Sequence, residues 1–289
     1  MRPFVNFLST VSWSPDGAAI AFSGYRRTRQ VDNDPEPIYE LFTVGADGRG
    51  LKPIAGTEDA IAPVFSPDGR TLAFTRQIYR DSKTRVGGRV WRDGFDGTSV
   101  WTVDLPTGRQ RQLTPWRDGV NFAASSFSPD GATLLATHED ERLLSQAEPV
   151  ALAVDGSGSR RLFEDGSLPV YSPDGTEIAM IRRVVEYGRE GGESSDLYVI
   201  RADGTGLRRL TRTPGLYELY PAWDPSGERL AYARLAFGDE REAFGLGGAL
   251  MQVNADGSCA TKVSSSPRAA IFALAWQPGP GRGAGRIAC

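Results

Sequence analysis

The sequence predicts an all-β protein, a six-bladed β-propeller with four-stranded antiparallel blades. An aromatic residue followed by a tight-turn motif occurs six times, as WSPDG, FSPDG (twice), YSPDG, WDPSG and WQPG. Successive copies lie roughly 50 residues apart, a period typical of propeller blades. The 34 glycines and 19 prolines among 289 residues suit short strands and tight turns. The six aromatic residues are Trp13, Phe65, Phe127, Tyr171, Trp223 and Trp276.

The repeated Ser-Pro-Asp-Gly sequence is typical of a type I turn between two antiparallel strands. Proline fixes φ at the second position, and glycine at the fourth accepts a positive φ. The motif precedes an alternating apolar run in each copy, which indicates a hairpin. An active site does not need several copies of its acid. We therefore assign a structural role to the aspartates of the motif, which are Asp16, Asp68, Asp130 and Asp174.

Each repeat contains three further strand patterns after the turn. An alternating strand comes first, a variable insert and a third strand follow, and an Asp-Gly type turn leads to a short fourth strand. Four strands repeated radially form a propeller. The second strands are expected at 19–24, 71–76, 133–138, 177–182 and 229–234, the third at 40–48, 99–108, 149–156, 196–204 and 249–257, and the fourth at 51–54, 111–114, 160–163, 208–211 and 261–263.

The sixth repeat is shorter than the others. It has a first strand at 273–276 and a candidate second strand, RIAC, at 286–289. An unpaired strand edge promotes aggregation, so the last blade is either incomplete or completed by residues 2–8 folding back onto it. The chain could also be the front part of a longer protein. We expect a single domain, 1–289, with blades starting near 11, 63, 125, 169, 221 and 273.

The repeats resemble those of TolB-type propellers. The shared features are the aromatic-SPDG motif, the downstream pattern seen in DLYVIRADG (196–204), and RRLT (208–211). This resemblance covers almost the whole chain and implies a six-bladed propeller that binds partners and has no catalytic residues of its own.

A narrower stretch resembles two propeller blades of acylaminoacyl-peptidase-like enzymes in the prolyl oligopeptidase family. These blades correspond to residues 91–114 and 137–156. In that family a separate α/β-hydrolase domain carries a Ser-Asp-His triad. This chain has no G-x-S-x-G nucleophile motif, so the resemblance implies no hydrolase activity here.

The long inserts indicate where a partner could bind. Both kinds of tight turn are expected on one rim of the propeller, which leaves the inserts 26–39, 77–98, 183–195 and 235–248 on the other rim. Arginines and aromatic residues on this rim and at the channel mouth are the candidate partner-binding residues, although residues of these types also pack locally as ordinary surface side chains. The candidates are Arg80, Arg89, Trp91, Arg92, Trp116, Tyr187, Tyr217 and Tyr220.

Catalytic and metal-binding motifs are weak. His138 is the only histidine and has no recognisable nucleophile partner, so no catalytic residue is predicted. The acidic loop 32–36 lacks the glycine and distal glutamate of a calcium-binding loop. Cys259 and Cys289 lack the charged surroundings of a reactive thiolate and are too few for a disulfide framework. We expect no metal and no cofactor.

Composition limits the classes of partner. The net charge is −3, and the inserts mix both signs of charge, which argues against nucleic acid. No apolar run approaches the length of a membrane span. The N-terminus does not read as a signal peptide, so the chain as written is expected in the cytoplasm, or in the periplasm or outside the cell if a leader was removed. We expect a monomer.

The favoured hypothesis is a non-catalytic scaffold that binds a protein or peptide through the insert-rich rim and the channel mouth. The first alternative is an accessory propeller of a serine peptidase whose hydrolase domain is absent. The second is a small-molecule enzyme with carboxylates at the channel mouth, an analogy that rests on fold alone.

Overall fold

The computed structural model describes residues 11–31, 34–79, 83–86, 89–92, 95–141, 147–185, 193–235, 248–266, 274–278 and 286–288. The elements assigned within these ranges are β-strands, most of them paired antiparallel, so the predicted all-β class is confirmed. The described residues include no helix of the length and apolar character needed to cross a membrane.

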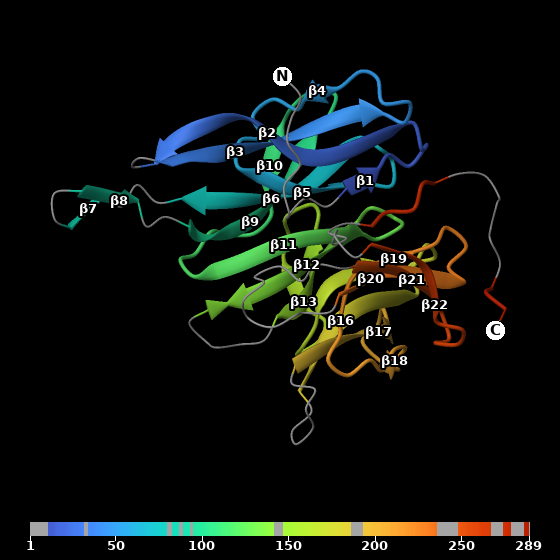
Figure 1. Cartoon of the computed structure of the whole chain (residues 1–289). Helices are drawn as coiled ribbons and strands as arrows, with labels where there is room; N and C mark the ends of the chain where they lie inside the picture. Colours follow the sequence, from blue (N-terminus) through green and yellow to red (C-terminus); the bar gives the residue numbers. More distant parts are fainter. Residues whose placement is uncertain are drawn as a thin grey trace.

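Four-stranded antiparallel sets follow one another along the chain (Figure 1), and we number those in the described ranges as units 1 to 5. Unit 1 is β1 (Val11–Trp13), β2 (Ala19–Val31), β3 (Asp34–Gly45) and β4 (Lys52–Pro53); unit 2 is β5 (Ala60–Phe65), β6 (Thr71–Tyr79), β9 (Phe95–Asp104) and β10 (Gln110–Gln112); unit 3 is β11 (Val120–Phe127), β12 (Thr133–Asp140), β13 (Glu148–Ala153) and β14 (Ser159–Arg161); unit 4 is β15 (Ser167–Tyr171), β16 (Glu177–Val185), β17 (Glu193–Arg201) and β18 (Arg208–Arg209); unit 5 is β19 (Tyr217–Trp223), β20 (Arg229–Leu235), β21 (Gly248–Asn254) and β22 (Thr261–Ser266).

Two parallel bridges join neighbouring units. Gly97 in β9 pairs with Val120 in β11, and Ser195 in β17 pairs with Tyr217 in β19. These bridges merge units 2 and 3, and units 4 and 5, into eight-stranded sheets. None of the sheets in the described ranges closes on itself.

The Ser-Pro-Asp-Gly segments form the tight turns that the sequence predicts. In unit 1 the Gly17 amide donates to the Ser14 carbonyl at 2.8 Å, and the Ser14 hydroxyl donates to Asp16 Oδ1 at 2.5 Å. That side-chain hydrogen bond lowers the pKa of Asp16. The same bonds recur in units 2, 3 and 4. The structural role predicted for these aspartates is therefore confirmed.

All the tight turns gather on one rim, which we call the turn rim. Within each unit a backbone bond joins the two turns, as between the Ala46 amide and the Ala18 carbonyl at 2.8 Å. Between units, each turn glycine lies beside the turn proline of the preceding unit. A Cβ placed on Gly69, for example, would lie 3.3 Å from Pro15 Cδ. The opposite rim, the insert rim, therefore carries the long second-to-third and fourth-to-first connections.

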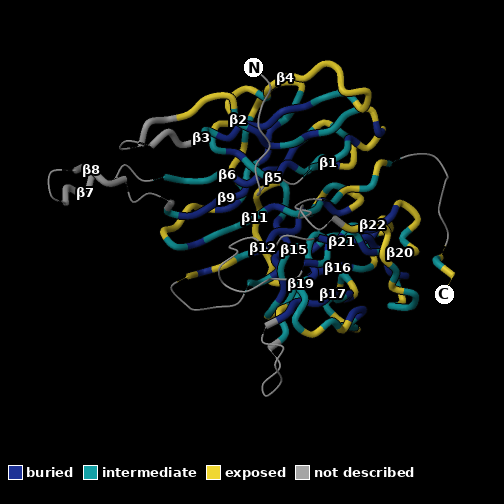
Figure 2. The backbone as a smooth tube through the Cα atoms, viewed as in Figure 1, coloured by how far each residue is buried: buried dark blue, intermediate teal, exposed yellow. Residues whose placement is uncertain are grey.

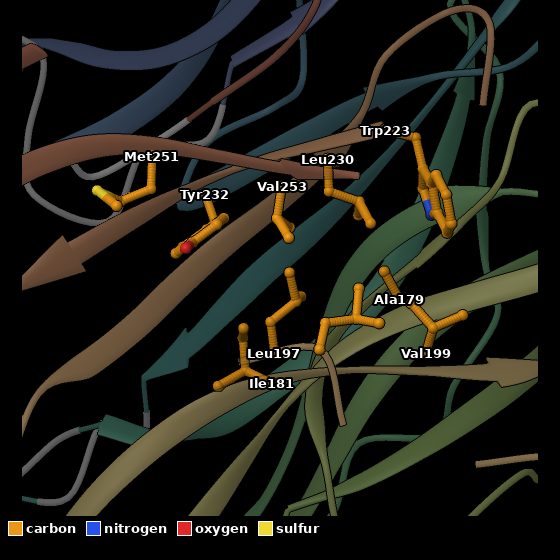
Figure 3. Close-up of a cluster of buried hydrophobic side chains, with 10 residues drawn as sticks. Ala179, Ile181, Leu197, Val199, Trp223, Leu230, Tyr232, Met251 and Val253 are labelled. Atoms are coloured by element: carbon orange, nitrogen blue, oxygen red, sulfur yellow. The ribbon is translucent and has the colours of Figure 1, made fainter. Parts of the chain in front are cut away.

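The core consists of apolar side chains packed between neighbouring units. Figure 3 shows Leu230, Tyr232 and Val253 of unit 5 facing Ile181 and Leu197 of unit 4. All five are almost completely buried, and Figure 2 shows buried residues along the middle of the sheets. Each such side chain contributes about 1.5–3 kcal/mol of hydrophobic stabilisation.

Polar bonds also connect the units. The guanidinium groups of Arg111 and Arg208 donate to turn carbonyls of the following unit, at Asp155 (2.7 Å) and Ala255 (2.9 Å). Cys259, which has a left-handed φ of 56°, is disulfide-bonded, a feature that the cysteine count did not predict.

Candidate functional site

The first strands of the units surround a small cavity of about 100 Å³. It is lined by short segments from units 1 to 5 and by Leu274, which precedes the sixth aromatic residue. Its lining is largely apolar. We call it the axial cavity, and the lining residues are Val11, Ser12, Pro63, Val64, Ala124, Ser125, Leu168, Val170, Tyr220, Pro221 and Leu274.

Irregular backbone recurs in the strands that line this cavity. Strands β5, β11, β15 and β19 each shift register against the strand that follows. Three residues in these segments have φ values of 52–55°, and each lies three positions before the repeat aromatic: Ala62, Leu168 and Tyr220. Left-handed backbone costs a side-chain-bearing residue about 1–2 kcal/mol, and bulges re-aim side chains at sheet edges and sites. The repeated bulge therefore shapes the cavity wall.

Tyr220 is the predicted site residue that reaches the axial cavity. It is half-buried, and burial raises the pKa of its hydroxyl above the ordinary value for tyrosine. Tyr217 lies on the same strand, at the start of β19 on the insert rim. Trp116 lies in the connection between β10 and β11 and is 38% exposed. The structure thus places Tyr217 and Tyr220 on one strand and Trp116 on another unit.

The remaining predicted site residues belong to the inserts 77–98 and 183–195. Arg80 and Tyr187 lie outside the described residues. Strand β8 (Arg89–Arg92) contains the other three, Arg89, Trp91 and Arg92, and pairs with β7 (Lys83–Val86) in a separate two-stranded sheet. Figure 1 shows this hairpin standing apart from the main sheets. The backbone register places Trp91 opposite Thr84, and Arg92 opposite Lys83.

A charged cluster lies at the insert-rim end of unit 1. Glu40, only 6% exposed, accepts hydrogen bonds from Arg26 (3.0 Å) and Arg27. Burial alone would raise the pKa of Glu40, but hydrogen bonds and charge from the two arginines outweigh it and leave the pKa lowered. Arg27 also reaches Glu58 at 3.4 Å. The sequence analysis did not identify this cluster.

A buried polar network joins units 4 and 5 on the same side of the molecule. Asp196 of β17 and Glu218 of β19 are both fully buried. The hydroxyl groups of Thr211 and Thr213 each lie within hydrogen-bond distance of both carboxylates. Arg234 donates to Glu218 Oε1 through Nε at 3.1 Å and Nη2 at 2.6 Å. Arginine-paired acids of this kind are the form in which buried charges are tolerated.

The network has fewer protons than hydrogen-bond contacts. Each threonine hydroxyl can donate once, so two of the four threonine–carboxylate contacts lack a proton when both acids are ionised. Burial raises the pKa of Glu218 despite its partners. A proton on Glu218 would satisfy one of the remaining contacts. No sequence motif marks this network, because its members come from four separate segments.

His138 makes local contacts. Its ring stacks on Phe122 with centroids 4.6 Å apart, and Nδ1 lies 3.6 Å from Glu148 Oε2. In the part of the chain that the structure describes, no three His, Cys, Asp or Glu residues form a group that could hold a metal ion. Asp32, Asn33 and Cys289 lie outside that part.

Sequence comparison identifies TolB proteins as relatives. No family model matches the chain. It is 26% identical over 213 residues to a TolB homolog from Chlorobium luteolum, covering 70% of this chain and 43% of that protein. It is 30% identical over 132 residues to the Tol-Pal system protein TolB of Anaeromyxobacter dehalogenans, covering 44% and 27%. The chain therefore spans less than half the length of these curated relatives.

Solved structures support the same fold. A TolB structure from Agrobacterium tumefaciens aligns with a TM-score of 0.67 at 17% identity, over 93% of this chain and 86% of that one. Enzymes are also similar in fold. An oligogalacturonate lyase in complex with manganese aligns at 0.54 with 13% identity, over 90% and 68%. A puromycin-hydrolyzing peptidase from Mycobacterium tuberculosis aligns at 0.55 with 15% identity, over 89% and 39%. The chain thus has a TolB-like β-propeller fold.

Proposed function

We propose that the chain is a single-domain, six-bladed propeller, 1–289, that binds a protein or peptide partner through the insert rim and the mouth of the axial cavity. Its blades start near 11, 63, 125, 169, 221 and 273. The proposal assigns it no catalytic step. The observation that carries the proposal is the sidedness of the fold, with minimal turns on one rim and long connections on the other.

Two contacts support the count of six. Gly17 of unit 1 lies against Pro278, since a Cβ placed on Gly17 would be 2.7 Å from the Pro278 carbonyl oxygen. Pro278 follows the sixth repeat aromatic at the position that Pro15 occupies after the first. Gln277 also donates to the Gly17 carbonyl at 3.4 Å. The position of the segment 274–278 next to unit 1 therefore supports the proposal that it is the first strand of a sixth blade.

We expect Gly17→Ala to destabilise the protein by about 1–2 kcal/mol more than Gly48→Ala. Both glycines have a positive φ, of 68° and 77°, so the backbone strain is matched. A Cβ on Gly48 would meet nothing within 4 Å, whereas a Cβ on Gly17 would meet Pro278. Urea unfolding of both variants measures the difference. Equal losses would mean that the contact between unit 1 and 274–278 is absent in solution.

The TolB relatives favour a protein partner. One of them is a Tol-Pal system protein by name, and the likeness supports a propeller that works by binding. A rigid set of sheets can present loops with little further ordering on association, and arginine and aromatic residues are frequent binding anchors. On this chain such residues occur in the β7–β8 hairpin, at Arg89, Trp91 and Arg92, and on β19, at Tyr217 and Tyr220.

Excision of the β7–β8 hairpin tests the binding surface. Tyr79 pairs with Phe95 at its base, so replacing 81–93 with a short Asn-Gly turn keeps the β6–β9 ladder intact. We expect this variant to fold normally and to lose a partner that the intact protein recovers in affinity purification from its native cells. Quantitative mass spectrometry measures the recovery.

A matched control changes the turn rim instead. Arg49 and Arg109 are exposed there, and their double substitution by Glu alters charge without touching the insert rim. This control should recover the partner as the intact chain does. Equal recovery of the partner by the hairpin-excision variant would show that the hairpin is not part of the binding surface. Loss of the partner in the turn-rim control alone would place the binding surface on the turn rim.

The second candidate is an accessory propeller of a serine peptidase. It is favoured by the likeness to a peptidase of which this chain covers 39%. A hydrolase reading frame directly downstream of the coding sequence, and co-purification of its product, would support this candidate over a free-standing scaffold.

A further inference from the structure

A polar groove lies where unit 3 meets unit 4, at the turn-rim end of the strands. It has a volume of about 330 Å³ and is open to solvent. Its lining comes from the second, third and fourth strands of unit 3, the turn between the last two, and the first strand of unit 4. None of these residues lines the axial cavity. We call it the lateral groove, and its polar lining residues are Thr133, Ser157, Ser159, Arg160 and Tyr171.

Arg160 has the same place in its unit as Arg111 and Arg208 have in theirs. Each pairs with a third-strand residue whose own second-strand partner lies two positions after the start of that strand. Arg111 and Arg208 use this place to bridge units, by donating to the carbonyls of Asp155 and Ala255. In the part of the chain that the structure describes, the Arg160 guanidinium makes no hydrogen bond and no ion pair. Its donors are therefore available to a ligand.

The acid that pairs with this arginine in unit 4 has no counterpart in unit 3. Arg208 donates to both oxygens of Glu177, through Nη1 to Oε1 at 2.6 Å and through Nη2 to Oε2 at 3.0 Å. Glu177 begins β16, and the residue that begins β12 is Thr133. Threonine is shorter and uncharged, so the space that a carboxylate fills beside Arg208 belongs to the open groove beside Arg160. A carboxylate matches the paired donors of a guanidinium, and unit 4 thus indicates which group this space accepts.

Tyr171 contributes a second polar group from unit 4. It is half-buried, and its hydroxyl has no hydrogen-bond partner within the described ranges. Burial raises the pKa of Tyr171, and the positive charge of Arg160 opposes this rise, so the two groups are close enough to interact. The negative charge of Asp130 also acts on Tyr171, but this carboxylate already accepts the Ser128 hydroxyl at 2.5 Å and the Ala132 amide at 3.0 Å. The groove therefore keeps an unpaired cation and an unpaired hydroxyl side by side.

We propose that the lateral groove binds a small hydroxylated carboxylate, whose carboxylate group pairs with Arg160. The hydroxyl groups of Thr133, Ser159 and Tyr171 can both donate and accept, so they suit a ligand that carries several hydroxyl groups of its own. Arg160 is exposed, and water screens an exposed ion pair. The affinity is therefore low, with a Kd on the order of 1 mM. This inference does not depend on the partner proposed for the insert rim, because the two surfaces share no residue.

An NMR titration of the purified, isotope-labelled full chain tests the inference. The probes are glucuronate, gluconate and tartrate. The controls are glucose, which lacks the carboxylate, and acetate, which lacks the hydroxyl groups. At least one probe should shift the backbone amide signals of residues 157–160 in a saturable way, and both controls should bind about tenfold more weakly or worse. No saturable shift with any of the three probes, or equally tight binding of acetate or glucose, would overturn the proposal.

Three variants locate the binding. Thr133→Glu supplies in unit 3 the carboxylate that Glu177 supplies in unit 4, so it should occupy Arg160 and abolish binding without lowering Tm. Arg160→Gln should weaken binding by about tenfold or more. Arg49→Gln removes an equally exposed arginine of the same rim in unit 1 and should bind as the wild type does. Unchanged affinity in Thr133→Glu and Arg160→Gln, or an equal loss in Arg49→Gln, would overturn the proposal. No protein partner is added, so these results are independent of the hairpin-excision experiment.

Discussion

Replacing Arg234 with Met should lower the free energy of unfolding by about 3–5 kcal/mol at neutral pH. Arg234 is the cation that donates to the buried carboxylate of Glu218, at 2.6 and 3.1 Å. Methionine keeps most of the side-chain volume but leaves Glu218 without its charge partner. The loss is large because an uncompensated charge in the interior cannot be solvated. Urea unfolding followed by intrinsic fluorescence measures it.

The dependence on pH separates this mechanism from a packing defect. Burial raises the pKa of Glu218 above its unfolded value, so the folded protein holds this proton more tightly. The stabilisation that comes from protonated Glu218 is fully present below the pKa of this group in the unfolded chain. It is lost as the pH rises through the pKa of the group in the folded protein. The difference in the free energy of unfolding between wild type and Arg234→Met should therefore be smaller at acidic pH than at neutral pH.

The double variant Arg234→Met/Glu218→Gln is the control for the same network. It removes both charges, so it should be more stable at neutral pH than Arg234→Met alone. The loss in unfolding free energy of Arg234→Met could instead stay constant with pH, and the double variant could be no more stable than Arg234→Met. These two results together would show that lost packing, and not an unpaired carboxylate, explains the loss.

Replacing Gly97 with Ala should cost about 3 kcal/mol. Gly97 forms the parallel bridge between units 2 and 3, and its φ is 140°. A Cβ there would lie 2.5 Å from the Val120 carbonyl oxygen, which belongs to the backbone of the neighbouring strand and cannot rotate away. The substitution should therefore weaken the bridge between the two units as well as strain the chain. Thermal and urea unfolding measure the loss.

Gly48→Ala is again the comparison, because Gly48 has a positive φ, of 77°, but has open space around it. It should cost only the strain of the left-handed backbone, about 1 kcal/mol. Hydrogen exchange should in addition show faster exchange at β9 and β11 in Gly97→Ala. A loss no larger than that of Gly48→Ala would mean that the two units do not depend on the close approach at Gly97.

The turns and strands were predictable because their causes are local. The turn around Asp16 depends on four consecutive residues, and its hydrogen bonds are made between them. The apolar pattern in β20 (Arg229–Leu235) likewise predicts a strand, and this pattern lies entirely within the strand itself. The repeat multiplies these local signals, so the all-β class and the TolB-like likeness followed from the sequence.

The candidate site was predictable only in part. Arginines and aromatic residues on long connections mark an exposed surface, but spacing alone could not indicate that Tyr220 reaches the axial cavity. The placement of Tyr220 depends on a bulge in β19, where the register shifts between Leu219 and Ala222. A bulge of this kind requires the partner strand to be known.

The sequence by itself determined the repeat, its turns and the all-β class of the chain, because each of these results from interactions among residues within a few positions of one another. Only the tertiary structure decided which charges are buried and which surfaces are open. Asp196 and Glu218 come from different units, as do Gly69 and Pro15, and nothing in their local sequence records that they lie close together. The physical reason is that burial and hydrogen bonding between units depend on how whole sheets pack, which no single segment encodes.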